Sequence, residues 1–161
     1  MHVFSKLSQD TLGVIGGFLS SEEFHYLCLT SKEIYEEIKL FKYLKLNKEY
    51  SLLFYKNEEF RNKVISSIED KSKQLSLDLS YCRNVSVVSA LGGVHTLNLR
   101  YCHNVTDVSA LGGVHTLDLR GCRNVTDVSA LGGVHTLNLS YCRNVTDVSA
   151  LGGVHTLDLT E

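Results

Sequence analysis

The sequence predicts an α+β protein, with a small N-terminal helical bundle followed by a repeat solenoid whose parallel sheet has about five short strands. The main observation is a 20-residue unit, Val94–Gly113, which recurs twice and begins again at Val154. A divergent copy starts at Gln74. Self-similarity at a fixed period indicates a repeat architecture. The second observation is a change of composition, because residues 1–73 contain every lysine of the chain.

Each repeat contains two leucines that alternate with polar residues, which is the period of a half-buried strand. These pairs are Leu77 and Leu79, Leu97 and Leu99, Leu117 and Leu119, Leu137 and Leu139, and Leu157 and Leu159. Burying the apolar side chains of one unit contributes roughly 10–20 kcal/mol. Ordering its backbone costs about 20–40 kcal/mol. One unit therefore cannot fold alone, whereas stacked units share a core.

The rest of each repeat lacks helical spacing and ends in Gly-Gly, which is a turn signal. We expect a convex side made of 3₁₀ turns or irregular chain. An aspartate (Asp107, Asp127 or Asp147) is placed to cap one 3₁₀ turn in each later copy. The first copy has Val87 at this position, so its turn is expected to be looser.

The pattern V-x-x-L-x-L-x-x-C-x-x-V-T-D resembles the leucine-rich repeat in its cysteine-containing form. The resemblance covers Gln74 to the C-terminus and implies a solenoid of parallel strands. Leucine-rich repeats span about 20–29 residues, so these units are at the short limit. A mean helix needs about 11 residues, which leaves no room for one in the return path.

Composition excludes several classes of protein. The 161 residues carry a net charge of −2, which gives no argument for nucleic-acid or membrane attraction. No apolar run approaches the ~20 residues of a spanning helix, and the N-terminus lacks a signal-peptide core. We therefore expect a cytoplasmic or nuclear protein that is not secreted.

The N-terminal region contains sequence signals for the starts of helices. Residues 7–19 have near-helical apolar spacing weakened by three glycines, and the capping boxes Ser20–Glu23 and Thr30–Glu33 open two further helices. This region resembles the F-box, through Leu7-Ser8-x-Asp10, Phe18-Leu19-Ser20, Glu23-Phe24 and the apolar residues between and after them. The resemblance implies docking on a Skp-type adaptor of a cullin–RING ubiquitin ligase. The adaptor-binding residues are then Leu7, Leu12, Ile15, Leu19 and Phe24.

We accordingly divide the chain into an F-box-like module (1–45), a helical bridge that caps the solenoid (46–73) and the repeats (74–161). In the bridge, Asn57 opens a helix whose inward residues are expected to be Phe60, Val64, Ile65 and Ile68. A shorter helix is expected over Glu49–Tyr55. The last strand has no such lid, so its edge invites edge-to-edge self-association.

When the repeats are aligned, equivalent residues form columns, and two further columns have chemically active side chains. Cys82, Cys102, Cys122 and Cys142 are candidates for disulfides, metal binding or nucleophilic attack, but they point inward, and we interpret them as buried structural thiols. His95, His115, His135 and His155 form a linear ladder, which is a poor zinc tetrahedron, so we interpret them as turn anchors. We expect no metal, no cofactor and no enzymatic activity.

Five asparagines match a glycosylation sequon: Asn84, Asn104, Asn124, Asn138 and Asn144. We interpret them as turn chemistry of the repeat. A glycan on Asn138 would also collide with the sheet.

The positions that vary between copies flank the inward leucines and are expected to face outward. The expected target-binding residues on this strand face are Asn98, Arg100, Tyr101, Asp118, Arg120, Asn138 and Tyr141. Arg and Tyr are frequent anchors of protein recognition. We therefore predict the substrate-recognition subunit of an SCF-type ligase, which binds an unknown target protein. The alternatives are a leucine-rich-repeat scaffold without a ligase role and a surface adhesion protein.

Overall fold

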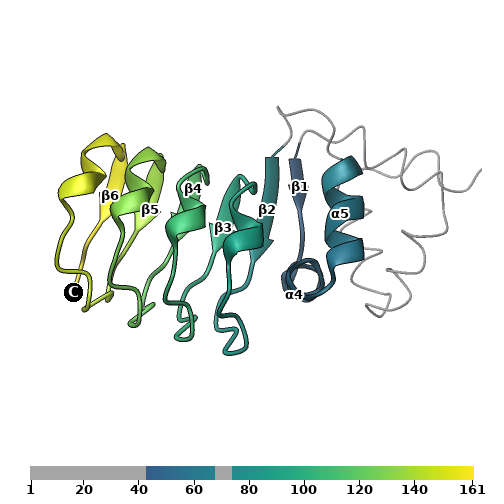
Figure 1. Cartoon of the computed structure of the whole chain (residues 1–161), viewed down its shortest axis with the longest axis horizontal. Coiled ribbons are helices and arrows are strands. Elements are labelled where there is room, and N and C mark those ends of the chain that lie inside the picture. The colour runs from purple at the N-terminus through teal and green to yellow at the C-terminus, as the bar shows by residue number, and fades with distance from the viewer. Residues whose placement is uncertain (1–42, 68–73) are drawn as a thin grey trace, which may run out of the picture. The chain divides into compact units, whose positions relative to one another are not determined.

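The computed structural model describes residues 43–67 and 74–161, which belong to two compact units divided between Lys73 and Gln74 (Figure 1). Residues 1–42 of the predicted helical module (1–45) lie outside the described residues, and its last three residues form a strand rather than a helix. All five expected adaptor-binding residues, Leu7 to Phe24, lie within residues 1–42. The described part of the first unit is a strand and two helices, and the second unit contains the repeats.

The first unit contains β1 (Tyr43–Lys45), α4 (Lys48–Lys56) and α5 (Glu58–Ser67). Two asparagines begin the helices, because Asn47 Oδ1 accepts from Tyr50 N at 2.9 Å and Asn57 Oδ1 accepts from Phe60 N at 2.8 Å. The guanidinium of Arg61 donates to two carbonyls at the end of α4. Both expected bridge helices are therefore present in the structure.

The buried face of α5 differs from the expectation at one residue. Phe60 and Val64 are buried as predicted, whereas Ile65 is 50% exposed, so its predicted inward position is wrong. Ile65 directly follows Val64, and one step along a helix turns a side chain by about 100°. Ile68 lies outside the described residues.

The second unit is a stack of 20-residue coils whose strands pair in parallel and in register. Its strands are β2 (Gln74–Asp78), β3 (Thr96–Asn98), β4 (Thr116–Asp118), β5 (Thr136–Asn138) and β6 (Thr156–Asp158). Each leucine pairs with the equivalent leucine of the next coil, as Leu97 pairs with Leu117. This unit confirms the predicted parallel sheet of about five short strands.

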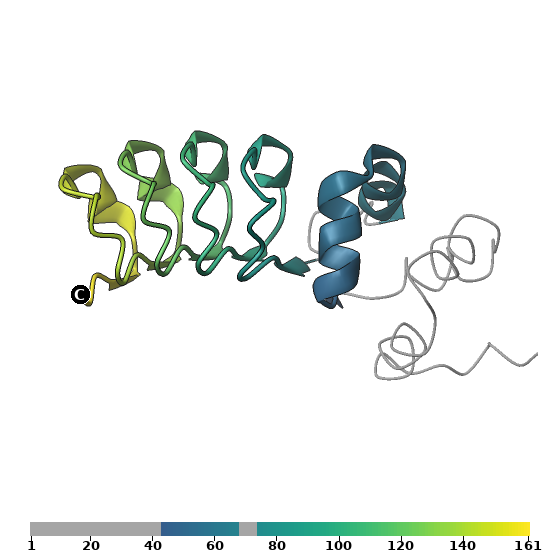
Figure 2. The same cartoon turned by 90° about the horizontal axis from the view of Figure 1, so that it is seen from below.

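In each coil a 3₁₀ turn leads the chain back toward the start of the next strand. The strands therefore lie along one side of the stack and the turns along the other (Figure 2). The turns are η1 (Ser89–Leu91), η2 (Ser109–Leu111), η3 (Ser129–Gly133) and η4 (Ser149–Gly153). Between the two sides lies the predicted core. In the second copy, all seven inward side chains from Val94 to Leu111 are at most 3% exposed.

The aspartate before each later turn acts as predicted, whereas the expectation for the first copy is wrong. Asp107, Asp127 and Asp147 each accept the serine N–H two residues on at 2.9 Å. The first turn lacks this bond, since Val87 stands there. It nevertheless closes with the same Leu N to Val O distance, 2.9 Å, as the second and third. Packing against the next coil is sufficient to form the turn.

The Gly-Gly pair lies in a turn in the first two copies, as predicted, and its first glycine has a further role. At Gly92 and Gly112 φ is −64° and −62°, which is ordinary right-handed backbone. A Cβ on Gly112 would instead lie 2.3 Å from the carbonyl oxygen of Ala130 in the next coil. The first glycine of the pair is therefore required by the close approach of neighbouring coils rather than by its backbone conformation.

Candidate functional site

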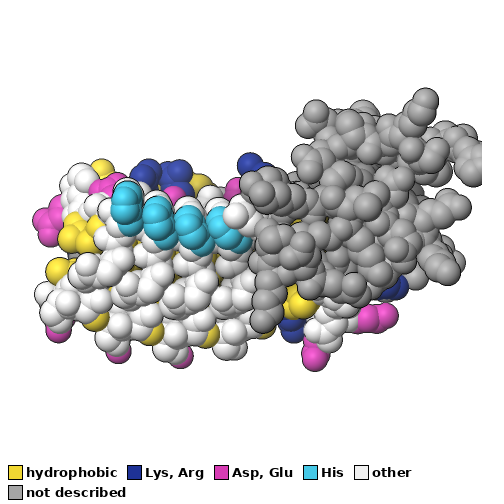
Figure 3. Space-filling view, turned by 90° about the horizontal axis from the view of Figure 1, so that it is seen from above, with side chains coloured by type: hydrophobic (Ala, Val, Ile, Leu, Met, Phe, Trp, Pro, Cys, Tyr) yellow, Lys and Arg dark blue, Asp and Glu magenta, His cyan; other side chains and the backbone are white. Residues whose placement is uncertain are grey.

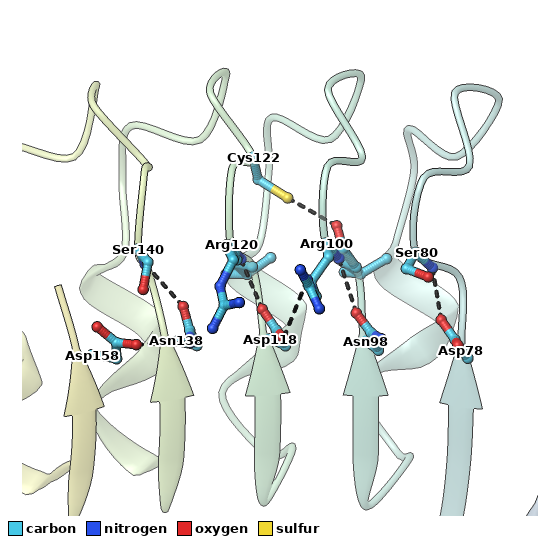
Figure 4. A network of polar contacts seen from close by, with 12 residues as sticks. Asp78, Ser80, Asn98, Arg100, Asp118, Arg120, Cys122, Asn138, Ser140 and Asp158 are labelled. Carbon is cyan, nitrogen blue, oxygen red and sulfur yellow. Dashed lines mark hydrogen bonds and ion pairs between the residues drawn. The ribbon is translucent and has the colours of Figure 1, made fainter. Parts of the chain in front are cut away.

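A ladder of short polar side chains crosses the carboxyl ends of the strands (Figure 4). Its members alternate between aspartate and asparagine: Asp78, Asn98, Asp118, Asn138 and Asp158. In each coil the Oδ1 atom accepts the backbone N–H two residues on, at 2.9–3.1 Å. These bonds fix the direction in which the chain leaves each strand, because an Asx turn holds the side chain against its own backbone.

The alternation reduces repulsion between neighbouring strands. Asn98 pairs with Asp118, and Asn138 with Asp158, so no two carboxylates face each other directly in the ladder. Asn138 Nδ2 also donates to Asp158 Oδ2 at 3.1 Å. Hydrogen bonds from Thr160 lower the pKa of Asp158 to about 2.

Arginines and serines occupy the next column, just beyond the strand ends. Arg100 and Arg120 on the middle strands are half-buried, and Arg100 Nε lies 3.9 Å from Asp118 Oδ2. The outward prediction is wrong for the serines of this column, because Ser80 is 8% and Ser140 only 2% exposed. A serine hydroxyl is too short to leave the bend, whereas the long arginine stem reaches solvent with its charged end.

Tyrosines follow the arginine column in an unusual backbone conformation. Tyr81, Tyr101 and Tyr141 have φ of 60°, 55° and 60°, and the equivalent Gly121 has φ of 69°. The left-handed region costs a side chain with a Cβ roughly 1–2 kcal/mol. Gly121 shows that one coil accepts glycine at this position, so a tyrosine is not required in every coil. Residues held in a costly conformation cluster at functional sites, which makes the tyrosines candidates for such a site.

Two of these tyrosines form a stack. The rings of Tyr81 and Tyr101 lie 5.1 Å apart at 25°, and Tyr81 is 57% exposed. The ring of Tyr101 covers Gly121, where an added Cβ would meet it at 2.5 Å. The His103 ring meets the Tyr101 ring edge-on, with 6.1 Å between the ring centroids. The Arg100 guanidinium lies 5.9 Å from the centre of the Tyr101 ring.

Five of the expected target-binding residues, Asn98, Arg100, Asp118, Arg120 and Asn138, lie in two adjoining columns at the strand ends. Tyr101 lies beside Arg100, and Tyr141 occupies the equivalent position two coils further on. We name these seven residues together with Tyr81, Asp78 and Asp158 the strand-end face. The three added residues occupy columns that vary between copies, and the sequence analysis used that variation but did not include these residues in the target-binding set.

The histidine column forms a second exposed feature, along the amino ends of the strands. The imidazoles of His95, His115, His135 and His155 stack with centroids 4.5–4.6 Å apart, as a stripe along the unit (Figure 3). Each Nδ1 contacts the hydroxyl of the following threonine at 3.2–3.3 Å. Burial, and then the charge of His115, lower the pKa of His95.

The cysteine column is internal and bonded to the backbone. Cys102, Cys122 and Cys142 each donate an S–H to a leucine carbonyl of the preceding coil at 3.0 Å. All four column thiols are buried. Burial raises the pKa of Cys122 to about 12. Since the thiolate is the reactive form, this thiol is inert, in agreement with its interpretation as structural.

The asparagines of the sequons bond across the coils. Asn124 and Asn144 donate from Nδ2 to carbonyls of the preceding coil at 2.6 Å, and Asn104 does likewise. The same amide nitrogen would carry a glycan, so these bonds agree with a turn role. Asn138 donates its amide to Asp158 on the sheet.

Comparisons with protein-family models, with curated proteins and with solved structures find no match. Function is therefore argued from the geometry of the chain itself. Within the described ranges, no three His, Cys, Asp or Glu side chains are grouped to hold a metal ion. The helices in those ranges are too short or too polar to cross a bilayer.

Proposed function

We propose that this protein is the target-recognition subunit of an SCF-type ubiquitin ligase, built on leucine-rich repeats. Three exposed or half-exposed tyrosines at positive φ, with Tyr101 beside Arg100, are the observation that carries the recognition role. Tyr and Arg are enriched among the residues that dominate binding energy between proteins. The ligase role rests on the resemblance of residues 1–45 to the F-box. The ubiquitin chemistry belongs to other subunits, and this chain supplies proximity.

Two substitutions in the full-length chain separate the two binding functions. Leu7→Asp places a charge in the expected adaptor surface, and Tyr101→Gly removes a ring where Gly121 shows that glycine is accepted. We expect Leu7→Asp to lose a Skp-type adaptor while retaining the target protein, and Tyr101→Gly to do the reverse. Affinity purification from cell extract, with mass spectrometry, measures both.

Each negative result has a defined meaning. A wild-type chain that retains no Skp-type adaptor excludes the ligase role and leaves a protein-binding scaffold. A target that binds wild type and Tyr101→Gly equally well places the binding site away from the strand-end face. Equal thermal unfolding of wild type and variants is the control for folding.

A further inference from the structure

A row of basic side chains lies one residue beyond the buried cysteines. Arg83, His103, Arg123 and Arg143 occupy this position in successive coils, and we name them the basic row. The three arginines are exposed, and His103 is half-buried. None of these coils has an acidic residue at this position, whereas the strand-end face contains both signs of charge. The basic row therefore presents a single sign of charge.

The backbone of the row is bonded from one coil to the next. The carbonyl oxygens of its first three residues each accept a hydrogen bond from the side-chain amide of an asparagine in the following coil. These asparagines are Asn104, Asn124 and Asn144. Neighbouring coils are about 4.8 Å apart, so the four backbone positions span about 14 Å. The side chains of the row therefore start from evenly spaced and fixed positions.

The guanidiniums of the basic row differ from those of the strand-end face in their counter-charges. Arg100 lies 3.9 Å from Asp118. Hydrogen bonds from Thr160, and after them the charge of Arg120, lower the pKa of Asp158. Within residues 43–67 and 74–161, by contrast, no carboxylate lies within 4.0 Å of a guanidinium of the row. The exposed aspartates before the 3₁₀ turns have their pKa values lowered by serine hydrogen bonds, with no contribution from the row.

We infer that the target protein presents to the basic row an extended segment with acidic side chains at alternate positions. This inference rests on the proposed target-binding function and names the chemistry of its partner. Carboxylates accept charge-assisted hydrogen bonds from guanidiniums, and exposed arginines without a counter-charge are free to donate them.

The length of the row fits the repeat of an extended chain. Alternate side chains of a strand lie on one face about 6.7 Å apart, so acidic residues at the first, third and fifth positions span about 13 Å. The row spans about 14 Å from Arg83 to Arg143. The outer carboxylates then meet these two arginines, and the middle one lies between His103 and Arg123.

The other charges of the repeats favour an acidic peptide over a nucleic acid. A nucleic acid needs a broad basic patch, whereas residues 74–161 contain no lysine and more acidic than basic side chains. Asp78 and Asp118 also precede residues of the row by five positions, so a wide polyanion would meet carboxylates in the same coils. A single extended chain occupies a width of about 4.8 Å and can follow the row alone.

The test begins with selection of random nine-residue peptides, displayed on phage, against the immobilised full-length protein. The expected binders share Asp or Glu at alternate positions. A synthetic binder is expected to lose about tenfold or more in affinity when amides replace its carboxylates, and to weaken with added salt. This comparison changes the peptide only, so it does not depend on the folding of a variant.

A variant of the protein locates the peptide on the row. Arg83→His/Arg123→His/Arg143→His copies His103 and removes the three charges at about pH 8, because the ordinary pKa of histidine is about 6.5. We expect a loss of about tenfold or more. The matched control, Arg100→Ser/Arg120→Ser, copies Ser80 and Ser140 and removes guanidiniums that already act on carboxylates, so a smaller loss is expected. Equal thermal unfolding of both variants and wild type is the control for folding.

The contrary results separate the inference from the proposed function. Binders without alternate acidic residues, or with equal affinity for the row variant, overturn the inference while target binding stands. A larger loss for the strand-end control than for the row variant also overturns it. Displacement of the peptide by a single-stranded oligothymidylate would indicate a nucleic-acid partner instead. Failure to select any peptide contradicts target binding itself, and the inference falls with it.

Discussion

The inner coils and the last coil of the stack have nearly the same sequence but different burial. Leu119 is fully buried, whereas its equivalent Leu159 is 45% exposed. Val128 is 1% exposed and its equivalent Val148 is 39% exposed. Burial is therefore a property of two neighbouring coils rather than of one. This is the behaviour of a quasi-one-dimensional architecture, in which each repeat contributes its own stability and one interface with each neighbour.

The largest expected difference is between two leucine substitutions. Leu119→Ala removes a fully buried side chain, and we expect it to lower the free energy of unfolding by about 2–5 kcal/mol. Leu159→Ala removes a side chain that water already reaches, and about 1 kcal/mol or less is expected. Urea unfolding followed by circular dichroism measures both. Equal costs would show that burial does not depend on a neighbouring coil.

Two glycines provide the next comparison. A Cβ on Gly112 would meet the Ala130 carbonyl oxygen at 2.3 Å, whereas one on Gly152 meets nothing within 4 Å. We expect Gly112→Ala to destabilise by about 1–3 kcal/mol. Gly152→Ala is expected to stabilise by about 0.4–1 kcal/mol, because alanine restricts the unfolded chain. Thermal unfolding measures the stability of both variants. A Gly112→Ala variant more stable than Gly152→Ala would contradict the close approach of the coils at Gly112.

The histidine stripe is expected to make stability depend on pH. Burial and His115 hold the pKa of His95 below the ordinary 6.5, so the unfolded chain takes up this proton at a higher pH than the folded one. Stability from this group is complete above pH 6.5 and decreases as pH falls toward the folded pKa. Melting temperatures at pH 7.5 and about 5.5 measure this decrease. His95→Gln should reduce it, and an unchanged slope would contradict the assignment.

The smallest expected effect is that of an exposed aspartate. Asp127→Val copies the first repeat, in which Val87 precedes a turn of the same geometry. We expect a smaller loss of stability than for Gly112→Ala. The Ser129 bonds lower the pKa of Asp127 below 3.8, so their contribution is present above that pH and disappears as pH falls through the folded pKa. A variant as unstable as Gly112→Ala would show that the carboxylate, not the stacking, forms the turn.

Most of the fold of the second unit could be predicted from the repeat itself. The 20-residue period predicted the strands, their register and the inward-facing positions. Each of these assignments is supported by every copy of the repeat, because equivalent residues recur at the same place in each coil. The strand-end face could be predicted only in part. The residues that vary between copies identified Arg100, Asp118 and Tyr101 as outward-facing positions. They did not show that Ser80 and Ser140, in the same set of positions, are buried. Nor could they show which side chains meet across coils.

The sequence by itself determined a stack of 20-residue coils with leucine, valine and cysteine inside, because a repeating pattern admits one inward set. The tertiary structure alone decided at which residues the packing of neighbouring coils restricts the side chain or the backbone conformation. Gly112 is glycine because of a carbonyl in the next coil, and the positive φ falls on tyrosines rather than on the Gly-Gly pair. Such contacts join residues about 20 positions apart, so only the stacked chain brings them together.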